Sequence, residues 1–294
     1  MERCDALDGV VDGIVADPRL CDFSPLRDLP PCKNDVDKAG CFTQAQIAAL
    51  EKVHKGPSSN GQKLGAEFFF SGVESYRGPS PEKSMLGQPH LLEFSWNVSG
   101  FPGDPRLYPD LYGPGLPSAH YSTGSNWLRF IVFGDSQYLL ENFDFNSTSD
   151  VSTYFNATAP QLPSSPDLSA FRARGGKLIE YHGWGESNVN PAATVEFYEA
   201  SAAVMGSIDR LKTFDRLFMV PGMTHCGGGP GAWAFDPLPI LERWVEQGQA
   251  PDSIVGSNPD TGVTRPICAY PNVARLIRPG LDPSLASNFR CIAP

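Results

Sequence analysis

The feature that most constrains the fold is a strand, a loop and a helix that follow one another twice after residue 165. An apolar strand at 177–182 precedes a predicted helix over 190–206, and a second strand at 216–220 precedes a helix over 236–248. Asn-Pro and Asp-Pro pairs mark the helix starts, and a glycine marks each helix end. Because strands joined in this way lie parallel, the pattern predicts an α/β fold with a parallel sheet.

Each predicted strand leads into a glycine-containing loop that carries an ionisable residue. Glu186 follows the first strand and His225 follows the second. Loops at the carboxyl ends of parallel strands are where α/β enzymes keep acid and base groups. A carboxylate there can orient an imidazole and stabilise its charged form, as in acyl-transfer enzymes. A solvated glutamate and a hydrogen-bonding loop histidine would explain each residue singly, whereas their order after two strands favours an acid–base pair.

Residues 1–165 lack this alternation, and we expect them to form a lid domain next to a catalytic part at 166–294. From residue 57 onward the lid is rich in glycine, proline, serine and aromatic residues, which suits a cover over a pocket for a ring-bearing ligand. Phe130 and Phe133, in its strongest apolar run, are candidate substrate contacts. Packing of the rings within the lid is the alternative for either residue.

The clearest helix of the predicted lid lies at 42–56. Thr43 is its N-cap, Gln46 completes a capping box, and Gly56 ends the helix. We assign this helix to packing and give it no chemical role.

Three aspartates and two glycines form an acidic loop near the N-terminus, with Asp5, Asp8 and Asp12 within eight residues. Carboxylates that lie so close repel one another unless a cation sits among them. Calcium binds six to eight oxygens in such loops, some of them backbone carbonyls, although the spacing here is not that of an EF-hand. We favour calcium over an Asp-Gly turn with solvated carboxylates, because a bond between Cys4 and Cys21 would close the loop into a compact unit.

Cysteine usage indicates an oxidising, secretory compartment, because six of the seven cysteines form close pairs in the sequence. Local pairing is the simplest of several connectivities and would join 4 with 21, 32 with 41, and 268 with 291, the last pair holding a proline-rich tail at 251–294. Glycosylation sequons give further support, although they are common by chance: Asn97, Asn146 and Asn156. Cys226 is left without a local partner and no signal peptide is visible; both would follow if the N-terminal part of the protein were missing.

Charge and hydropathy narrow the range of partners. The net charge is -10 at pH 7 and no basic cluster is present, which disfavours nucleic acids and anionic membranes. No apolar run reaches the length of a membrane-spanning helix. We therefore expect a small-molecule ligand, and the sequence does not indicate an oligomeric state.

Five motifs, in this order along the chain, resemble those of the tannase and feruloyl esterase family. They are CDALDGVVDGI from Cys4, CFTQAQ from Cys41, YHGWGE from Tyr181, PGMTHCGGGPG from Pro221 and RPICAYP from Arg265. Members of this family are secreted serine esterases of α/β-hydrolase fold with a large lid. The resemblance covers nearly the whole chain and implies hydrolysis of aromatic esters such as hydroxycinnamoyl or galloyl esters.

The resemblance also implies roles for single residues. His225 would be the general base and Glu186 its orienting acid, at a position where the family usually has aspartate. Cys226 would bond a cysteine next to the nucleophilic serine, which this sequence does not contain. A calcium ion in the lid would be held by three side chains and two backbone carbonyls: Asp5, Asp8 and Asp12, with Val10 and Ile14.

A nucleophile is the missing part of this reaction. No serine lies in the G-x-S-x-G setting of an α/β-hydrolase, and Ser136, the nearest match, lacks the second glycine. We therefore expect the C-terminal part of an α/β-hydrolase, inactive by itself, whose nucleophile lay upstream. One alternative is a non-catalytic, calcium-stabilised module that binds a phenolic ligand. Another is a metal enzyme using His182 and His225, which no ligand spacing supports.

Overall fold

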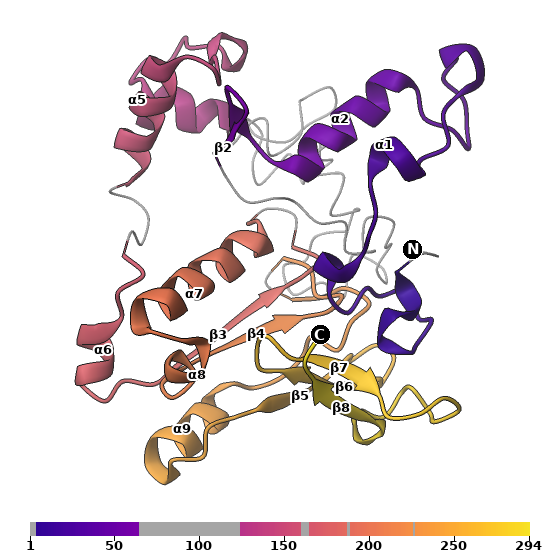
Figure 1. Ribbon diagram of the computed structural model, residues 1–294, viewed down its shortest axis with the longest axis vertical. Helices are drawn as coiled ribbons and strands as arrows, with labels where there is room; N and C mark the ends of the chain where they lie inside the picture. The colour runs from indigo at the N-terminus through magenta and orange to yellow at the C-terminus, as the bar shows by residue number, and fades with distance from the viewer. Residues whose placement is uncertain (1–3, 65–123, 160–164, 187–188, 226) are drawn as a thin grey trace, which may run out of the picture.

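The computed structural model (Figure 1) describes five stretches of the chain: residues 4–64, 124–159, 165–186, 189–225 and 227–294. At its centre lies a pair of parallel strands, β3 (Leu178–Gly183) and β4 (Asp215–Val220). Leu178 pairs with Asp215 and Gly183 with Val220, so the two strands begin and end together. The predicted parallel pairing is thereby confirmed.

Helices α7 (Pro191–Met205) and α8 (Ile208–Leu211) connect the two strands and pack on one face of them. The Asn190 side chain accepts a hydrogen bond from the Ala192 amide, and Gly206 ends α7 in the left-handed conformation, as the sequence predicts. Burial of each large apolar side chain contributes about 1.5–3 kcal/mol. The buried cluster on this face includes Val195, Tyr198, Ala202, Met205, Leu211, Leu217 and Met219.

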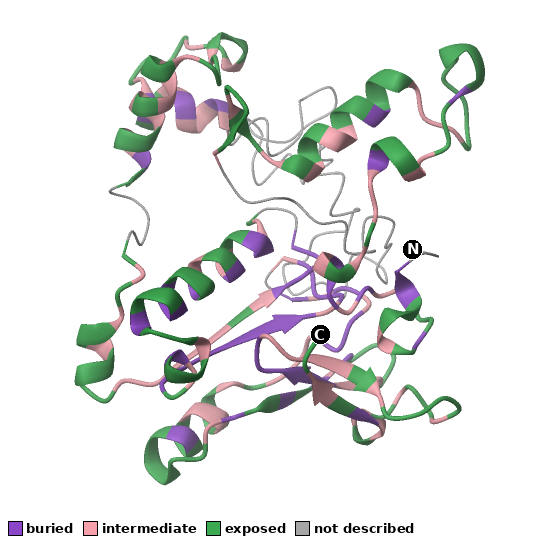
Figure 2. Cartoon of the chain, in the orientation of Figure 1, coloured by how far each residue is buried: buried purple, intermediate pink, exposed green. Residues whose placement is uncertain are grey.

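The alternate side chains of β4 point to the other face and join a second cluster. Phe218 and Val220 pack there with Ile254 and Ile267 from the C-terminal strands, and helix α9 (Leu238–Gln247) adds Ile240. Every residue of β4 is buried, as Figure 2 shows, because apolar layers cover both of its faces.

The C-terminal region differs from the predicted proline-rich tail, because it forms two antiparallel strand pairs. The strands are β5 (Ser253–Ser257) with β6 (Thr264–Cys268), and β7 (Val273–Leu276) with β8 (Phe289–Ile292). A disulfide between Cys268 and Cys291 joins β6 to β8, as expected from the local pairing. The strands are four or five residues long, and arginine and proline interrupt their apolar pattern, which hides them in the sequence.

The N-terminal segment contains short elements and one longer helix. Thr43 and Gln46 form the predicted capping box, and Gly56 follows the last turn. The other predicted local disulfides, Cys4–Cys21 and Cys32–Cys41, are also present. The elements are η1 (Asp5–Asp8), η2 (Pro18–Leu20), α1 (Pro25–Asp28), η3 (Lys33–Asp35), α2 (Gln44–Lys55), β1 (Ser58–Ser59) and β2 (Gln62–Lys63).

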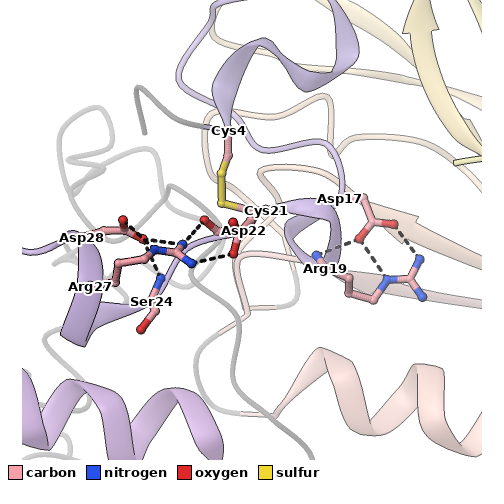
Figure 3. The surroundings of a disulfide bond; sticks show 8 residues. All are labelled: Cys4, Asp17, Arg19, Cys21, Asp22, Ser24, Arg27 and Asp28. Carbon is pink, nitrogen blue, oxygen red and sulfur yellow. Dashed lines mark hydrogen bonds and ion pairs between the residues drawn. A yellow bond between two sulfur atoms is a disulfide. The ribbon is translucent and has the colours of Figure 1, made fainter.

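Arg19 attaches the N-terminal clip, residues 4–21, to the core. Its guanidinium donates two hydrogen bonds to Asp17, which is buried (Figure 3). The same group lies over the rings of Trp184 and Tyr270, at 5.4 and 4.8 Å from their centroids. Trp184 directly follows β3, and the Tyr270 amide donates to Leu217 of β4, so the clip is held against both central strands.

Residues 124–159 form a separate helical segment above the strands in Figure 1. The apolar run at 126–133 is a π-helical turn, in which Leu128 and Val132 are buried. Residues 160–164, at the predicted boundary between lid and catalytic part, lie outside the described residues, so that division remains a prediction. The elements here and beyond are η5 (Trp127–Val132), η6 (Leu140–Asn142), α5 (Thr148–Thr158), α6 (Ser169–Ala173) and η8 (Ala286–Asn288). Within the described stretches, no helix is both long and apolar enough to cross a membrane.

Two carboxyl groups lie close together on the central strands, that of the half-buried Glu180 and that of Asp215. Asp215 of β4 is fully buried, and among the described residues no donor reaches either of its carboxylate oxygens. Burial, and then the neighbouring carboxyl of Glu180 on β3, raises the pKa of Asp215 to about 8, and burial also raises the pKa of Glu180. Two facing carboxyl groups can form a hydrogen bond only if one holds a proton, so we infer a shared proton.

We expect Asp215→Asn to stabilise the protein increasingly as the pH rises from about 4 to about 8. The folded wild type keeps a proton that the unfolded chain releases near the ordinary carboxyl pKa, so its free energy of unfolding falls through this range. The variant has an uncharged amide and avoids that loss, so its free energy of unfolding should exceed that of the wild type by about 1–3 kcal/mol near pH 8. Urea unfolding at both pH values, with Asp37→Asn as an exposed control, measures the difference; a difference that does not vary with pH would contradict the shared proton.

Candidate active site

The acid and base candidates leave the same edge of the sheet. Glu186 lies three residues beyond the end of β3, and His225 lies five residues beyond the end of β4. The two loops are tied together because the Trp184 amide donates to the Val220 carbonyl and the Gly185 amide donates to the Met223 carbonyl, both at 2.9 Å. The parallel register therefore brings the two candidates toward each other.

Gly183 permits this close approach of the loops. A Cβ at this position would lie 2.3 Å from the Met223 carbonyl oxygen, which is far inside van der Waals contact. A side chain here would push the loop of His225 away from the end of β3. The glycine in the strand is thus required by packing against backbone, which is a common reason for glycine within a strand.

Glu186 and His225 form a hydrogen-bonded pair, as predicted from their positions in the sequence. His225 Nδ1 and Glu186 Oε2 are 2.5 Å apart. The glutamate is 5% exposed, whereas the histidine side chain is 34% exposed, so the imidazole lies between the buried carboxylate and the surface. Because a carboxylate accepts, the proton is on Nδ1 and the lone pair of the neutral ring is on Nε2. This is the tautomer that a general base requires.

Further hydrogen bonds position the buried carboxylate. The Val189 amide donates to Glu186 Oε1 at 3.3 Å, and the Glu186 amide donates to the Gly183 carbonyl at 3.2 Å. A buried carboxylate is costly unless donors surround it, and the donors to this one are the Val189 amide and His225 Nδ1, whereas the Glu186 backbone amide holds the loop against the end of β3. The extra methylene of glutamate, relative to the aspartate usual in the resembling family, does not prevent the contact with His225.

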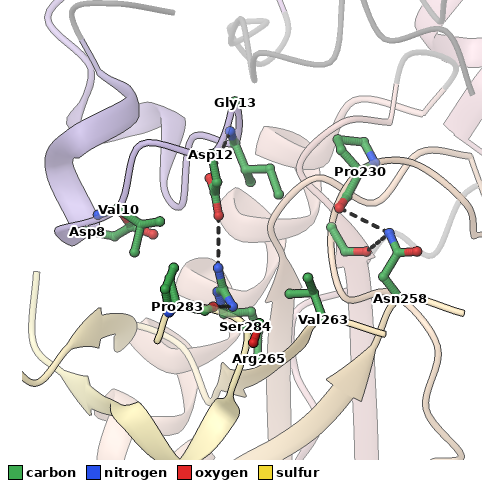
Figure 4. A network of polar contacts seen from close by, with 12 residues as sticks. Asp8, Val10, Asp12, Gly13, Pro230, Asn258, Val263, Arg265, Pro283 and Ser284 are labelled. Carbon is green, nitrogen blue, oxygen red and sulfur yellow. Dashed lines mark hydrogen bonds and ion pairs between the residues drawn. The ribbon is translucent and has the colours of Figure 1, made fainter. Parts of the chain in front are cut away.

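Asn258, in the loop after β5, braces the glycine-rich loop that follows His225. Its Nδ2 lies 2.9–3.2 Å from the carbonyls of residues 229–231, and the contact with Pro230 is drawn in Figure 4. Gly229 has a φ of +94°, and a Cβ there would lie 2.1 Å from the Gly222 carbonyl oxygen. This contact was not predictable from the sequence, because an asparagine before a proline indicates only a turn.

The candidate substrate contacts are not brought to the pair by any described contact. Phe133 stacks on Tyr138 with a centroid distance of 4.2 Å and meets the edge of Phe143 at 6.4 Å, all within the same segment. Phe130 is 61% exposed. Packing within the segment thus accounts for the position of Phe133, and a substrate role for either ring remains a prediction.

The acidic loop shows a mixed fit to the predicted calcium ligands. Asp5 Oδ1 accepts from the amides of Asp12 and Gly13, and Asp12 Oδ2 pairs with Arg265 at 2.9 Å (Figure 4). Burial raises the pKa of Asp8 to about 6 and also raises that of Asp12, with a contribution from neighbouring aspartates in each case. Such crowding of charge suits a cation, but in the described stretches no three His, Cys, Asp or Glu side chains are grouped closely enough to hold a metal.

The backbone of the same loop is shaped by its own carboxylates. The Val10 amide donates to Asp8 Oδ1 and the Ile14 amide donates to Asp12 Oδ1. The predicted carbonyl ligands therefore lie in Asp-centred turns, and Arg265 is a cation already present beside them.

The chain matches known esterases along nearly its whole length. The sequence pattern of the tannase and feruloyl esterase family matches residues 1–99 and 117–292. Mono(2-hydroxyethyl) terephthalate hydrolase of Piscinibacter sakaiensis is 32% identical over 316 residues, which cover 99% of this chain and 50% of that protein. Feruloyl esterase C of Talaromyces stipitatus is 29% identical over 306 residues, covering 95% and 50%.

Solved structures agree with these matches. Feruloyl esterase B from Aspergillus oryzae superimposes with a TM-score of 0.70 at 25% identity, over 99% of this chain and 54% of that one. Tannin acyl hydrolase from Aspergillus niger, at 19% identity and a TM-score of 0.65, shares the fold. The chain spans about half the length of the curated relatives that it matches. The match to the family pattern and the terephthalate-hydrolase relative confirm the resemblance seen in the motifs, and the chain belongs to the tannase and feruloyl esterase family.

Proposed function

We propose that this protein contributes the acid and base of an esterase that hydrolyses aromatic carboxylic esters. The observation that carries the proposal is the 2.5 Å contact between His225 Nδ1 and Glu186 Oε2 at the carboxyl ends of β3 and β4. His225 would act as the general base and Glu186 would orient it and stabilise its charged form.

The reaction would be acyl transfer through a serine. His225 Nε2 takes the proton of the serine hydroxyl as its oxygen attacks the ester carbonyl. The imidazolium then gives that proton to the departing alcohol oxygen, which leaves an acyl-enzyme and a neutral imidazole. Water activated by the same imidazole then attacks the acyl group and releases the aromatic acid. Because this sequence has no serine in the required setting, we propose that the nucleophile belongs to residues outside these 294.

The proposed substrates are hydroxycinnamoyl or galloyl esters. The names of the relatives support an aromatic acid, since they specify feruloyl, terephthalate and tannin compounds. Phe130 and Phe133 are the proposed contacts for the substrate ring.

Secretion is proposed on the basis of the disulfides and sequons. Three disulfides close local loops, which is typical of proteins that fold in an oxidising compartment. Asn146 and Asn156 lie on the surface, where glycosylation could occur, and Asn97 lies outside the described residues.

Turnover by the purified 294-residue chain tests the catalytic proposal. We expect no release of acid from feruloyl or galloyl esters above the level of His225→Ala, because removing one member of a catalytic triad lowers kcat by up to about a million-fold. A longer gene product with an in-frame Gly-Cys-Ser-x-Gly-Gly segment should hydrolyse these esters and lose the activity with His225→Ala. Turnover by the short chain that His225→Ala abolishes would refute the missing nucleophile; ligand binding without turnover by the longer product would favour the non-catalytic module.

We also propose that calcium binds the acidic loop through Asp5, Asp8 and Asp12 and the carbonyls of Val10 and Ile14. Three aspartates lie within a disulfide-closed clip, and, although burial is the main cause of the raised pKa values of Asp8 and Asp12, a neighbouring aspartate adds to each, so a cation among them would be favourable. A bound calcium ion would neutralise that charge and hold the clip closed.

Chelation should lower the melting temperature of the protein if calcium binds. At free calcium about 100 times above Kd, binding stabilises the folded state by about 2.7 kcal/mol, which EDTA would remove. Asp8→Asn should reduce the effect of EDTA, while the exposed Asp37→Asn should leave it unchanged. Equal melting temperatures with calcium and with EDTA would contradict the calcium proposal. The positive charge beside the aspartates would then be that of Arg265.

A further inference from the structure

His182 lies beside the candidate pair but is not part of it. It is the penultimate residue of β3, and its ring is partly buried between that strand and the first turn of α7. Both ring nitrogens are engaged: Nδ1 lies 2.7 Å from Thr194 Oγ1, and Nε2 lies 3.1 Å from the Val189 carbonyl oxygen. These contacts argue against the alternative in which His182 is a metal ligand.

The partners of His182 fix its tautomer. A carbonyl oxygen can only accept, so Nε2 carries the proton that is donated to Val189. In the neutral ring Nδ1 must then accept, and the Thr194 hydroxyl donates to it. Burial lowers the pKa of His182, and His225 lowers it further against the opposing influence of Glu186 and the Val189 carbonyl, so the neutral ring persists at neutral pH.

Val189 connects His182 to the catalytic acid. Its carbonyl accepts from His182, while its amide donates to Glu186 Oε1 at 3.3 Å. The other oxygen of that carboxylate contacts His225. Val189 is 56% exposed, so packing does little to hold this residue, and its backbone hydrogen bonds hold it instead.

We propose that His182 is a positioning residue for Glu186, holding Val189 so that the carboxylate keeps one oxygen toward the Val189 amide and the other toward His225. This inference rests on the proposed function of the Glu186–His225 pair. Thr194 contributes by fixing the imidazole tautomer that donates to Val189. Within this chain the acid is thus oriented from α7 and β3 together.

The proton on His225 Nδ1 is a direct reporter of this positioning. In the 294-residue chain with 15N-labelled histidine, NMR detects that proton by its downfield shift and by its rate of exchange with solvent. The contacts run from Thr194 through His182 and Val189 to Glu186. Loss of one of these hydrogen bonds should speed the exchange of the His225 Nδ1 proton with solvent by about 2- to 10-fold. A matched pair of variants isolates the contact: Thr194→Val removes the hydroxyl at nearly constant volume, and Thr194→Ser retains it.

We expect faster exchange and a shifted resonance in Thr194→Val and in His182→Phe, with near wild-type behaviour in Thr194→Ser and in the distant control His54→Ala. Glu186→Gln should move the resonance most, because it removes the charged acceptor. If Thr194→Val and His182→Phe lower stability toward urea but leave the resonance and its exchange unchanged, His182 is only a brace between strand and helix and the inference is wrong. If Glu186→Gln also leaves the resonance unchanged, the proposed pair itself fails.

Discussion

The common end of two parallel strands is the constraint on which the candidate site depends. Because Gly183 pairs with Val220, the loops after β3 and β4 start from the same point of the sheet. The Met223 carbonyl can then approach Gly183 closely and accept from the Gly185 amide. These two contacts hold the loop of His225 against the end of β3. A shift of one residue in the register would separate Glu186 from His225.

The site also illustrates how buried polar groups are stabilised near the candidate acid–base pair. The Glu186 carboxylate receives donors from His225 and Val189, and Asn258 satisfies carbonyls of the neighbouring glycine-rich loop. In the core, the buried Asp215 lies beside the carboxyl of Glu180, and no other described residue donates to it. We infer that the two carboxyl groups share a proton, which removes one negative charge. Charge is retained where it can orient the imidazole and neutralised where it would only destabilise the core.

Local signals in the sequence predicted several elements correctly. The capping box of Thr43 and Gln46, and the start of α7 at Asn190, depend on neighbouring residues alone, so they are visible without tertiary information. The order of strands and ionisable residues predicted the contact of Glu186 with His225. Local pairing of cysteines also proved right, because short loops bring such pairs together.

Features that depend on distant residues were not predictable in the same way. The brace from Asn258 and the contact of Asp12 with Arg265 each join segments far apart in the sequence. Strands β5 to β8 are short and rely on pairing with one another, so their residues carry a weak periodicity. The role of Phe133 likewise depends on which rings surround it in the fold.

A double-mutant cycle between Glu186→Gln and His225→Asn tests the central claim most directly. Urea unfolding of the wild type, the two single variants and the double variant gives the coupling free energy between the two side chains. A hydrogen bond to a charged group predicts a coupling of about 1.5–3 kcal/mol. Additive effects, with a coupling within about 0.5 kcal/mol of zero, would contradict the pairing of acid and base from which the proposed function follows.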